Sequence, residues 1–212
     1  MVMPTVGVLA LQGAFAKHAA VLQSLCVKVQ LVRSSEELQR CDALIIPGGE
    51  STTMLKHIDR MGLKEPLCSF AEKKPVLGTC AGLILLAQEV NDLTVLPLKI
   101  LDIHVVRNGY GRQVESFSAA ISLALPSSKK PFHALFIRAP RIKACGADVE
   151  VLATWNSEPV FVQQNRILAT TFHPELTDDP CIHRHFLSLL GHDSKDSNSE
   201  AAISGNSSVA PR

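Results

Sequence analysis

The chain is poor in aromatic residues and carries almost no net charge. Phe, Trp and Tyr make up 5% of its 212 residues, and 21 Lys and Arg against 20 Asp and Glu give a formal net charge of +1. A balanced charge provides no field to attract a polyanion, and few aromatic rings leave few surfaces on which bases can stack. We therefore expect no nucleic-acid partner.

Long hydrophobic runs and paired cysteines are also missing. The apolar run nearest the N-terminus, residues 6–11, is too short for a membrane span or a signal core, and Lys17 is the first cation. The six cysteines, at positions 26, 41, 68, 80, 145 and 181, form no C-x-x-C pair and no zinc-knuckle spacing. We interpret them as reduced thiols and expect a cytoplasmic protein with no membrane segment, no metal and no cofactor.

The chain does have enough apolar material for a continuous core. Hydrophobic residues make up 46% of it, and the mean hydropathy is +0.17. From about residue 191 the composition changes to Ser, Asn, Asp and Gly without aromatic residues, which cannot offset the entropy cost of ordering. We expect one domain over residues 1–190, followed by a disordered polar tail over residues 191–212.

Short β-branched runs alternate with helical patterns in the first half, which is typical of βαβ units and a parallel sheet. Expected strands there are 5–11, 27–32, 43–46 and 75–79, and expected helices are 14–26, about 50–74 and 81–88. The second half changes to short strands separated by polar turns, at 100–106, 116–123, 134–137, 149–154, 160–164 and 167–172, with a closing helix at 181–190. We predict an α/β fold with a mainly parallel sheet, to which antiparallel strands are added.

A strand-to-helix turn carries the candidate nucleophile, Cys80. Residues 78–82 read Gly-Thr-Cys-Ala-Gly, a G-x-C-x-G pattern like the nucleophile elbow. Such a turn strains the central residue and brings positions 78 and 82 together, so glycines fit there. The sulfur then lies over a helix N-terminus, which favours the thiolate. The alternative is a buried cysteine in a glycine-rich turn.

Residues 172–175, Phe-His-Pro-Glu, supply a candidate base and its partner. Pro174 biases His173 toward an extended backbone, which would place His173 and Glu175 on one side of the segment. His173 could then accept the proton of Cys80 while Glu175 fixes its tautomer. Alone, such a histidine is more often a strand-end residue with a local hydrogen bond, but together with the elbow it indicates a triad.

The loop at residues 45–52, Ile-Ile-Pro-Gly-Gly-Glu-Ser-Thr, presents backbone N–H groups before a helix. Neither G-K-[ST] nor G-x-G-x-x-G is present, which disfavours a nucleotide site. We interpret the loop as part of an oxyanion hole, in which the N–H groups of Gly49 and Ala81 hold the oxygen of a tetrahedral intermediate. The alternative is a plain turn in which Ser51 or Thr52 caps the helix.

Together the segments at 47–52, 78–82 and 172–175 resemble the class I (triad) glutamine amidotransferase family. The blocks at 11–13, 107–113, 136–140 and 175–177 are similar to the glutaminase subunits of pyridoxal 5'-phosphate synthases, so the resemblance spans about residues 5–190. Residues 96–100, Leu-Pro-Leu-Lys-Ile, depart from it, because the family usually has a glycine-leucine pair before the next strand. The serine-rich tail is not a family feature either.

The resemblance implies a three-layer fold with helices on both faces of the sheet, Cys80 as nucleophile, His173 as base and Glu175 as its orienting carboxylate. It implies Gly49 and Ala81 as oxyanion donors and places Gln12 at the contact with a synthase subunit. The glutamine-binding residues that it implies are Gly49, Glu50, Ser51, Arg107, Ile137 and Arg138. Independently of the resemblance, the glutamine α-carboxylate needs a cation, and Arg107 or Arg138 could provide it with a planar guanidinium group.

The implied reaction is hydrolysis of L-glutamine to glutamate and ammonia through a thioester. Roughly twenty tail residues are far too few for an acceptor domain. The resemblance implies that the ammonia passes through a protected channel to a separate TIM-barrel synthase subunit, which builds pyridoxal 5'-phosphate. Two alternatives stay open at this point: a stand-alone cysteine hydrolase or peptidase of related fold, and a catalytically silent regulatory module.

Overall fold

The computed structural model describes residues 3–92, 94–107, 109, 116–126, 128 and 130–194. Within them, seven strands form a sheet in the order β10-β11-β12-β4-β3-β1-β2. Its five parallel strands are β2 (Lys28–Val32), β1 (Thr5–Leu9), β3 (Ala43–Ile46), β4 (Val76–Thr79) and β12 (Ile167–Thr170). The antiparallel strands β11 (Glu158–Gln164) and β10 (Glu150–Trp155) follow at one edge. The predicted mainly parallel sheet with antiparallel additions is confirmed.

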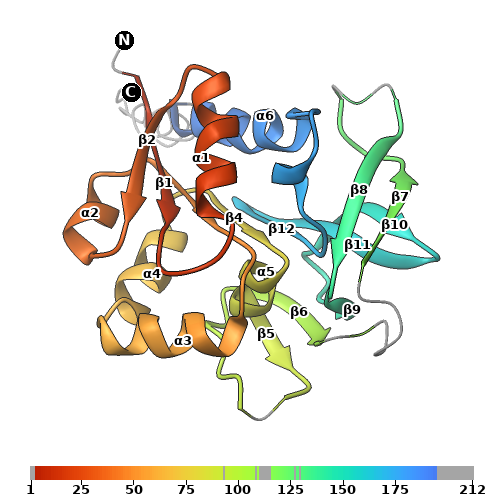
Figure 1. Cartoon of the computed structure of the whole chain (residues 1–212), viewed down its shortest axis with the longest axis horizontal. Helices are drawn as coiled ribbons and strands as arrows, with labels where there is room; N and C mark the ends of the chain where they lie inside the picture. Colours follow the sequence, from red (N-terminus) through yellow and green to blue (C-terminus); the bar gives the residue numbers. More distant parts are fainter. Residues whose placement is uncertain are drawn as a thin grey trace, which may run out of the picture.

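Helices cover both faces of this sheet, which gives three layers (Figure 1). One face carries α1 (Phe15–Ser24) and α6 (Cys181–Ser188), and the other carries α2 (Ser35–Gln39), α3 (Ser51–Arg60), α4 (Lys64–Ala71) and α5 (Ala81–Leu86). Strand β3 reads Ala-Leu-Ile-Ile and is buried throughout. Its side chains alternate, with Leu44 and Ile46 in one core cluster and Ala43 and Ile45 in the other. A strand enclosed on both faces needs this continuous apolar run.

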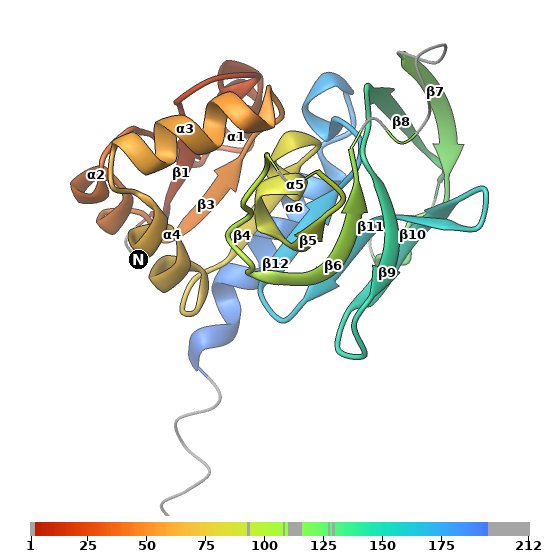
Figure 2. The ribbon, with the colours of Figure 1, turned by 90° about the horizontal axis from the view of Figure 1, so that it is seen from below.

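Within the described residues, the remaining five strands form two small sheets of their own, a separation that was not predicted from the sequence. They are β5 (Ala87–Val90), β6 (Leu101–Val106) and β9 (Arg141–Cys145) in one, and β7 (Ser116–Ile121) with β8 (Phe132–Ile137) in the other. Figure 2 shows both beside the β10–β11 edge of the main sheet. The prediction of helix at 87–88 is wrong, because α5 ends at Leu86 and Ala87 pairs with Leu101 in the small sheet.

Helix boundaries differ from the expected ones for local reasons. The single helix predicted over about 50–74 is two helices, α3 and α4, separated at Gly62, whose φ of +62° interrupts helical backbone. Helix α2 was missed, although Ser34 and Glu37 form a capping box that the sequence displays. Strand β1 ends at Leu9, two residues before its predicted end.

The atypical segment at residues 96–100 joins β5 to β6 by packing against the end of α5. The N–H of Leu98 donates to the carbonyl of Leu85, and that of Ile100 donates to the carbonyl of Leu86. At the other end of the domain, η2 (Leu189–Ser194) continues helical backbone through the first four residues of the predicted tail. The rest of that tail, residues 195–212, lies outside the described residues.

All six cysteines are unpaired, in agreement with the interpretation as thiols. In the part of the chain that the structure describes, no helix is both long and apolar enough to cross a bilayer.

Candidate active site

The central strands bring the predicted site residues to one edge of the sheet. Strands β12, β4 and β3 are neighbours and parallel, so the segments that follow them meet beyond their carboxyl ends. A cleft of about 520 Å³ opens there. Of the residues assigned to the site from sequence, all except Glu175 line this cleft, and Glu175 lies behind His173. Gly13, Ala14, Gly48, Ile84 and Leu176 also line it and were not predicted as site residues.

Cys80 has the strained backbone that the elbow pattern predicts. Its φ of 50° and ψ of −102° lie between strand β4 and helix α5. A Cβ at Gly78 would lie 2.8 Å from the backbone carbonyl carbon of Gly82, and one at Gly82 would overlap the carbonyl oxygen of Ile46. Both glycines are therefore required by close backbone contacts, as the sequence analysis expected. Cys80 is 7% exposed, and its Sγ lies 3.7 Å from the carbonyl oxygen of Ile137.

His173 and Glu175 are joined, but not along an extended segment as predicted. His173 Nδ1 lies 2.7 Å from Glu175 Oε1. His173 itself is non-helical, with φ −107° and ψ 88°, but Pro174 begins a 3₁₀ turn, η1 (Pro174–Leu176). Proline suits the first position of a helical turn, and this turn rotates Glu175 back toward the imidazole. The His173 N–H also donates to the carbonyl of Leu135 on β8, which anchors the segment.

The electrostatics of the pair favour a charged imidazole. Burial lowers the pKa of His173, but Cys80 on one side and Glu175 on the other raise it to about 10. Burial raises the pKa of Glu175, but the hydrogen bond from His173 outweighs it and leaves this pKa below its ordinary value. An ionised carboxylate only accepts hydrogen bonds, so His173 Nδ1 carries a proton and Nε2 is the atom left for the thiol.

The glycine loop after β3 is shaped by the segment that follows β1. A Cβ at Gly48 would overlap the His173 ring, so this glycine makes room for the imidazole. The Gly48 carbonyl accepts a hydrogen bond from the Ala14 N–H at 3.1 Å. Because C=O and N–H point in opposite directions across a trans peptide, the Gly49 N–H points away from Ala14. Gly13, with φ +89°, allows the two loops to approach.

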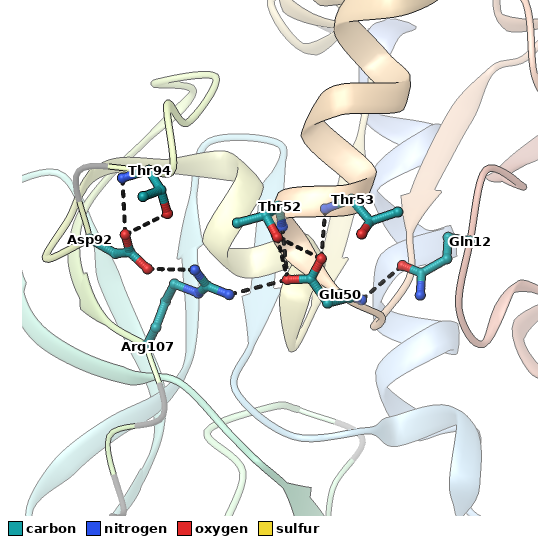
Figure 3. A network of polar contacts seen from close by, with 7 residues as sticks. All are labelled: Gln12, Glu50, Thr52, Thr53, Asp92, Thr94 and Arg107. Atoms are coloured by element: carbon teal, nitrogen blue, oxygen red, sulfur yellow. Dashed lines mark hydrogen bonds and ion pairs between the residues drawn. The ribbon is translucent and has the colours of Figure 1, made fainter.

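A polar network holds the rim of the cleft (Figure 3). Glu50 accepts hydrogen bonds from the N–H groups of Thr52 and Thr53 at 3.1 and 2.7 Å, and its own N–H donates to Gln12 Oε1 at 2.8 Å. Burial opposes ionisation of Glu50, but the hydrogen bonds from both threonines lower its pKa to about 2. Glu50 therefore caps α3, in place of the Ser51 or Thr52 cap considered from sequence. Ser51 is buried at the start of that helix.

The two candidate arginines differ in their surroundings. The Arg107 fork lies between two carboxylates, with Nη2 3.2 Å from Glu50 Oε1 and Nη1 2.6 Å from Asp92 Oδ2. Arg138, at φ +43°, lines the cleft, and among the described residues no carboxylate forms an ion pair with it. In the segment 107–113, which resembles the synthase glutaminase subunits, residues 108 and 110–113 lie outside the described residues.

Two fully buried histidines behind the His173–Glu175 pair were missed from the sequence. His18 of α1 and His183 of α6 lie 3.0 Å apart, Nδ1 to Nε2, and His18 Nε2 lies 3.3 Å from Glu175 Oε2. Burial lowers the pKa of His18 to about 4 and that of His183 to about 3, so both are neutral near pH 7. The available signal was the position of His18, one turn before buried Leu22 on the apolar face of α1.

We expect the domain to lose stability as the pH falls from 6.5 to 5. His18 and His183 take up protons in the unfolded chain near pH 6.5 but resist protonation in the fold, so the unfolded state binds more protons across this window. With these pKa values the free energy of unfolding drops by about 3 kcal/mol. Urea unfolding at the two pH values measures the drop. His104→Gln, a change at an exposed histidine outside this cluster, is the comparison variant. Equal free energies at both pH values would contradict the expectation.

The fold and the site together define a class of protein. A three-layer α/β domain that presents a cysteine on an elbow, with a His–Glu pair beyond the next parallel strand, is the arrangement of class I glutamine amidotransferases. Comparison with known proteins identifies the family. The chain belongs to the SNO glutamine amidotransferase family, which it matches over residues 8–190.

Individual relatives agree with this assignment. A pyridoxal 5'-phosphate synthase subunit PdxT of Thermotoga petrophila is 47% identical over 186 residues, which cover 87% of this chain and 98% of the relative. The PdxT of Geobacillus thermodenitrificans is 46% identical, with 87% and 94% covered. A crystal structure described as a glutamine amidotransferase matches with a TM-score of 0.82 at 44% identity, covering 88% of this chain and 98% of that one. The structure of a protein described as a GMP synthase component, from Thermoplasma acidophilum, shares the fold at 19% identity and a TM-score of 0.66, with 90% and 96% covered.

Proposed function

We propose that this chain is the glutaminase subunit of a pyridoxal 5'-phosphate synthase, which hydrolyses L-glutamine and supplies ammonia for vitamin B6 synthesis. The observation that carries the proposal is Cys80 on its strained elbow, beside a His173–Glu175 pair joined at 2.7 Å. Relatives that bear the name PdxT, at 44–47% identity over most of the chain, support the pathway. They also favour this function over a stand-alone peptidase or a silent module.

The first half-reaction forms a thioester. The sulfur of Cys80 attacks the side-chain amide carbon of glutamine, and the amide oxygen becomes an oxyanion. When the intermediate collapses, the C–N bond breaks, and the His173 imidazolium gives its Nε2 proton to the departing nitrogen, which leaves as ammonia. Glu175 keeps the Nδ1 proton in place and stabilises the charged ring.

The second half-reaction uses the same groups in reverse. Neutral His173 takes a proton from water, and the resulting hydroxide attacks the thioester carbon. A second oxyanion forms, the C–S bond breaks, and the sulfur of Cys80 leaves as the thiolate. The product is released as the side-chain carboxylic acid, which gives its proton to solvent and becomes glutamate. The cycle thus ends with the imidazolium and thiolate that began it.

Both oxyanions need donors, which we assign to the N–H groups of Ala81 and Gly49. Ala81 begins α5, so its N–H has no partner within the helix. The direction of the Gly49 N–H depends on the Gly48–Gly49 peptide, which the Ala14 N–H holds in one orientation. Removing a single donor from such a hole typically costs ~10²–10³ in rate. The orientation of one peptide therefore controls most of the activity.

Substrate recognition is assigned to the rim of the cleft. Arg107 is already balanced by Glu50 and Asp92, so the charge of Arg138 is the better match for the glutamine α-carboxylate. Glu50, with its low pKa, remains an anion and suits the α-ammonium group. Ser51, whose buried Oγ has no hydrogen-bond partner among the described residues, and Ile137 complete the assigned pocket together with Gly49.

We further propose that a separate synthase subunit binds at Gln12 and controls the glycine loop. Gln12 Oε1 accepts a hydrogen bond from the Glu50 N–H at 2.8 Å, and Glu50 follows the assigned oxyanion donor Gly49. A subunit that moves Gln12 would therefore also move the glycine loop. The resemblance describes that subunit as a TIM barrel that receives the ammonia through a channel.

We expect low glutaminase activity from the chain alone and a rise of roughly 10²-fold when the synthase subunit is added, because the gain corresponds to one oxyanion donor. Ammonia release from glutamine, measured with and without that subunit, tests the function and the gating together. Cys80→Ala mixed with the subunit is the control and releases none. Equal activity in both mixtures would contradict partner gating, and no ammonia in either would contradict the proposed function.

A further inference from the structure

We propose that His18 is a positioning residue for the catalytic carboxylate, and that His183 fixes the tautomer in which His18 does so. This inference rests on the proposed glutaminase function. It extends the triad away from the cleft, from Cys80 through His173 and Glu175 to two imidazoles that no substrate atom reaches.

The geometry places His18 against the half of the carboxylate that His173 does not use. Glu175 Oε1 is bound by His173 Nδ1 at 2.7 Å, whereas Oε2 is buried and has no hydrogen-bond partner among the described residues. His18 Nε2, 3.3 Å away, faces this oxygen. The same nitrogen lies 3.2 Å from the hydroxyl of Thr79, the residue before the nucleophile. His18 thus lies between the two segments that carry the reacting side chains.

The hydrogen-bond partners in this cluster determine which ring nitrogen of each histidine carries the proton. If His18 Nε2 carries the proton, its N–H donates to the Thr79 oxygen with its positive end 3.3 Å from the carboxylate, and bare Nδ1 accepts from His183 Nε2 at 3.0 Å. In the opposite arrangement a lone pair faces the carboxylate. His183 Nδ1 would then hold a buried proton that has no acceptor among the described residues. The first arrangement is therefore the stable one.

Burial explains why the carboxylate needs this partner. Glu175 is 4% exposed, and His18 and His183 are fully buried, so solvent cannot replace a lost donor. The titratable groups that face His18 are Glu175 on η1, His183 on α6 and, further away, His173. Without the His18 N–H, no positive group among the described residues would face buried Oε2, and rotation or protonation of Glu175 would release His173 from its catalytic orientation.

Two substitutions at one position test the proposal. Glutamine can place an amide N–H near the position of an imidazole Nε2, whereas asparagine reaches only as far as Nδ1. With the synthase subunit present, we expect His18→Asn to lower kcat about 10- to 100-fold with KM within twofold of the original. We expect His18→Gln to keep kcat within about threefold. His185→Gln, a change in a half-buried histidine of α6 that contacts Gln163, is the control and retains full activity.

A second measurement separates positioning from general damage. The His173 Nδ1 proton, hydrogen-bonded to Glu175, gives a far-downfield proton resonance that we expect in the original chain and in His18→Gln. In His18→Asn it moves upfield or exchanges away. If His18→Asn does not fold, His183→Phe and His183→Gln serve in its place, with the loss of kcat and of the resonance expected in His183→Phe alone.

Three outcomes would overturn the inference while leaving the proposed function intact. They are full kcat in His18→Asn, equal losses in the Asn and Gln variants together with a lowered melting temperature, and an unchanged resonance in His18→Asn. Failure of the proposed function is distinguishable, because the unaltered chain would then release no ammonia with its partner.

Discussion

Cys80→Ala is expected to abolish glutamine hydrolysis, with a fall in kcat of roughly 10⁴–10⁶-fold that addition of the synthase subunit does not restore. Without the sulfur no thioester forms, and the remaining donors and base act only weakly on water. The substitution fits the backbone of the elbow no worse than cysteine does, and the site is 7% exposed, so the fold should persist. Ammonia release and the melting temperature together measure the effect.

Covalent labelling sharpens this prediction. A glutamine-like electrophile should modify the unaltered chain at one position, and Cys80→Ala should prevent the modification. Cys26→Ala is the matched control, because Cys26 is exposed and lies outside the cleft. Labelling that persists in Cys80→Ala, or that Cys26→Ala abolishes, would assign the nucleophile to another thiol.

Glu175→Gln is expected to lower kcat by roughly 10³–10⁴-fold with the fold retained. The amide has almost the size of the carboxylate, but it can present an N–H to His173 Nδ1 in place of an acceptor. His173 would then carry its proton on Nε2, where it cannot accept one from the thiol. The loss of negative charge also removes one cause of the raised pKa of His173. Steady-state kinetics over a range of pH measure both effects.

Glu89→Gln is the control for this substitution, since Glu89 is an exposed carboxylate whose ion-pair partner is exposed His104. It should leave kcat unchanged. A kcat within tenfold of the original in Glu175→Gln would show that the carboxylate does not set the tautomer. The triad as proposed would then be reduced to a Cys–His pair.

The backbone geometry around the candidate nucleophile was predictable because its determinants are local. The elbow at 78–82 follows from two glycines that alone tolerate the close backbone contacts around Cys80. The strand at 43–46 followed from an unbroken apolar run. Assignment of Gln12, Glu50, Ser51 and Ile137 required the resemblance, because nothing local separates such residues from an ordinary turn or strand end.

Other features could not be predicted because they depend on pairing. Whether Ala87 continues a helix or starts a strand is decided by Leu101, its partner in a separate small sheet. The relation of Glu175 to His173 was expected from an extended chain but arises from a 3₁₀ turn. Side-chain alternation could not foresee that turn, because the preceding strand ends at Thr170 and three residues of irregular backbone intervene.

From the sequence alone came the nature of the chemistry: a thiol on a forced turn, an imidazole beside a carboxylate and a glycine loop. Each is encoded within a few adjacent residues by steric limits on the backbone. The tertiary structure decided which of these groups meet. Parallel pairing of Thr79 with Thr170 aligns segments more than ninety residues apart, and packing of α1 and α6 on one face of the sheet brings His18 and His183 to the back of Glu175. Periodicity shows that such a side chain is buried, but only the assembled layers determine what it faces.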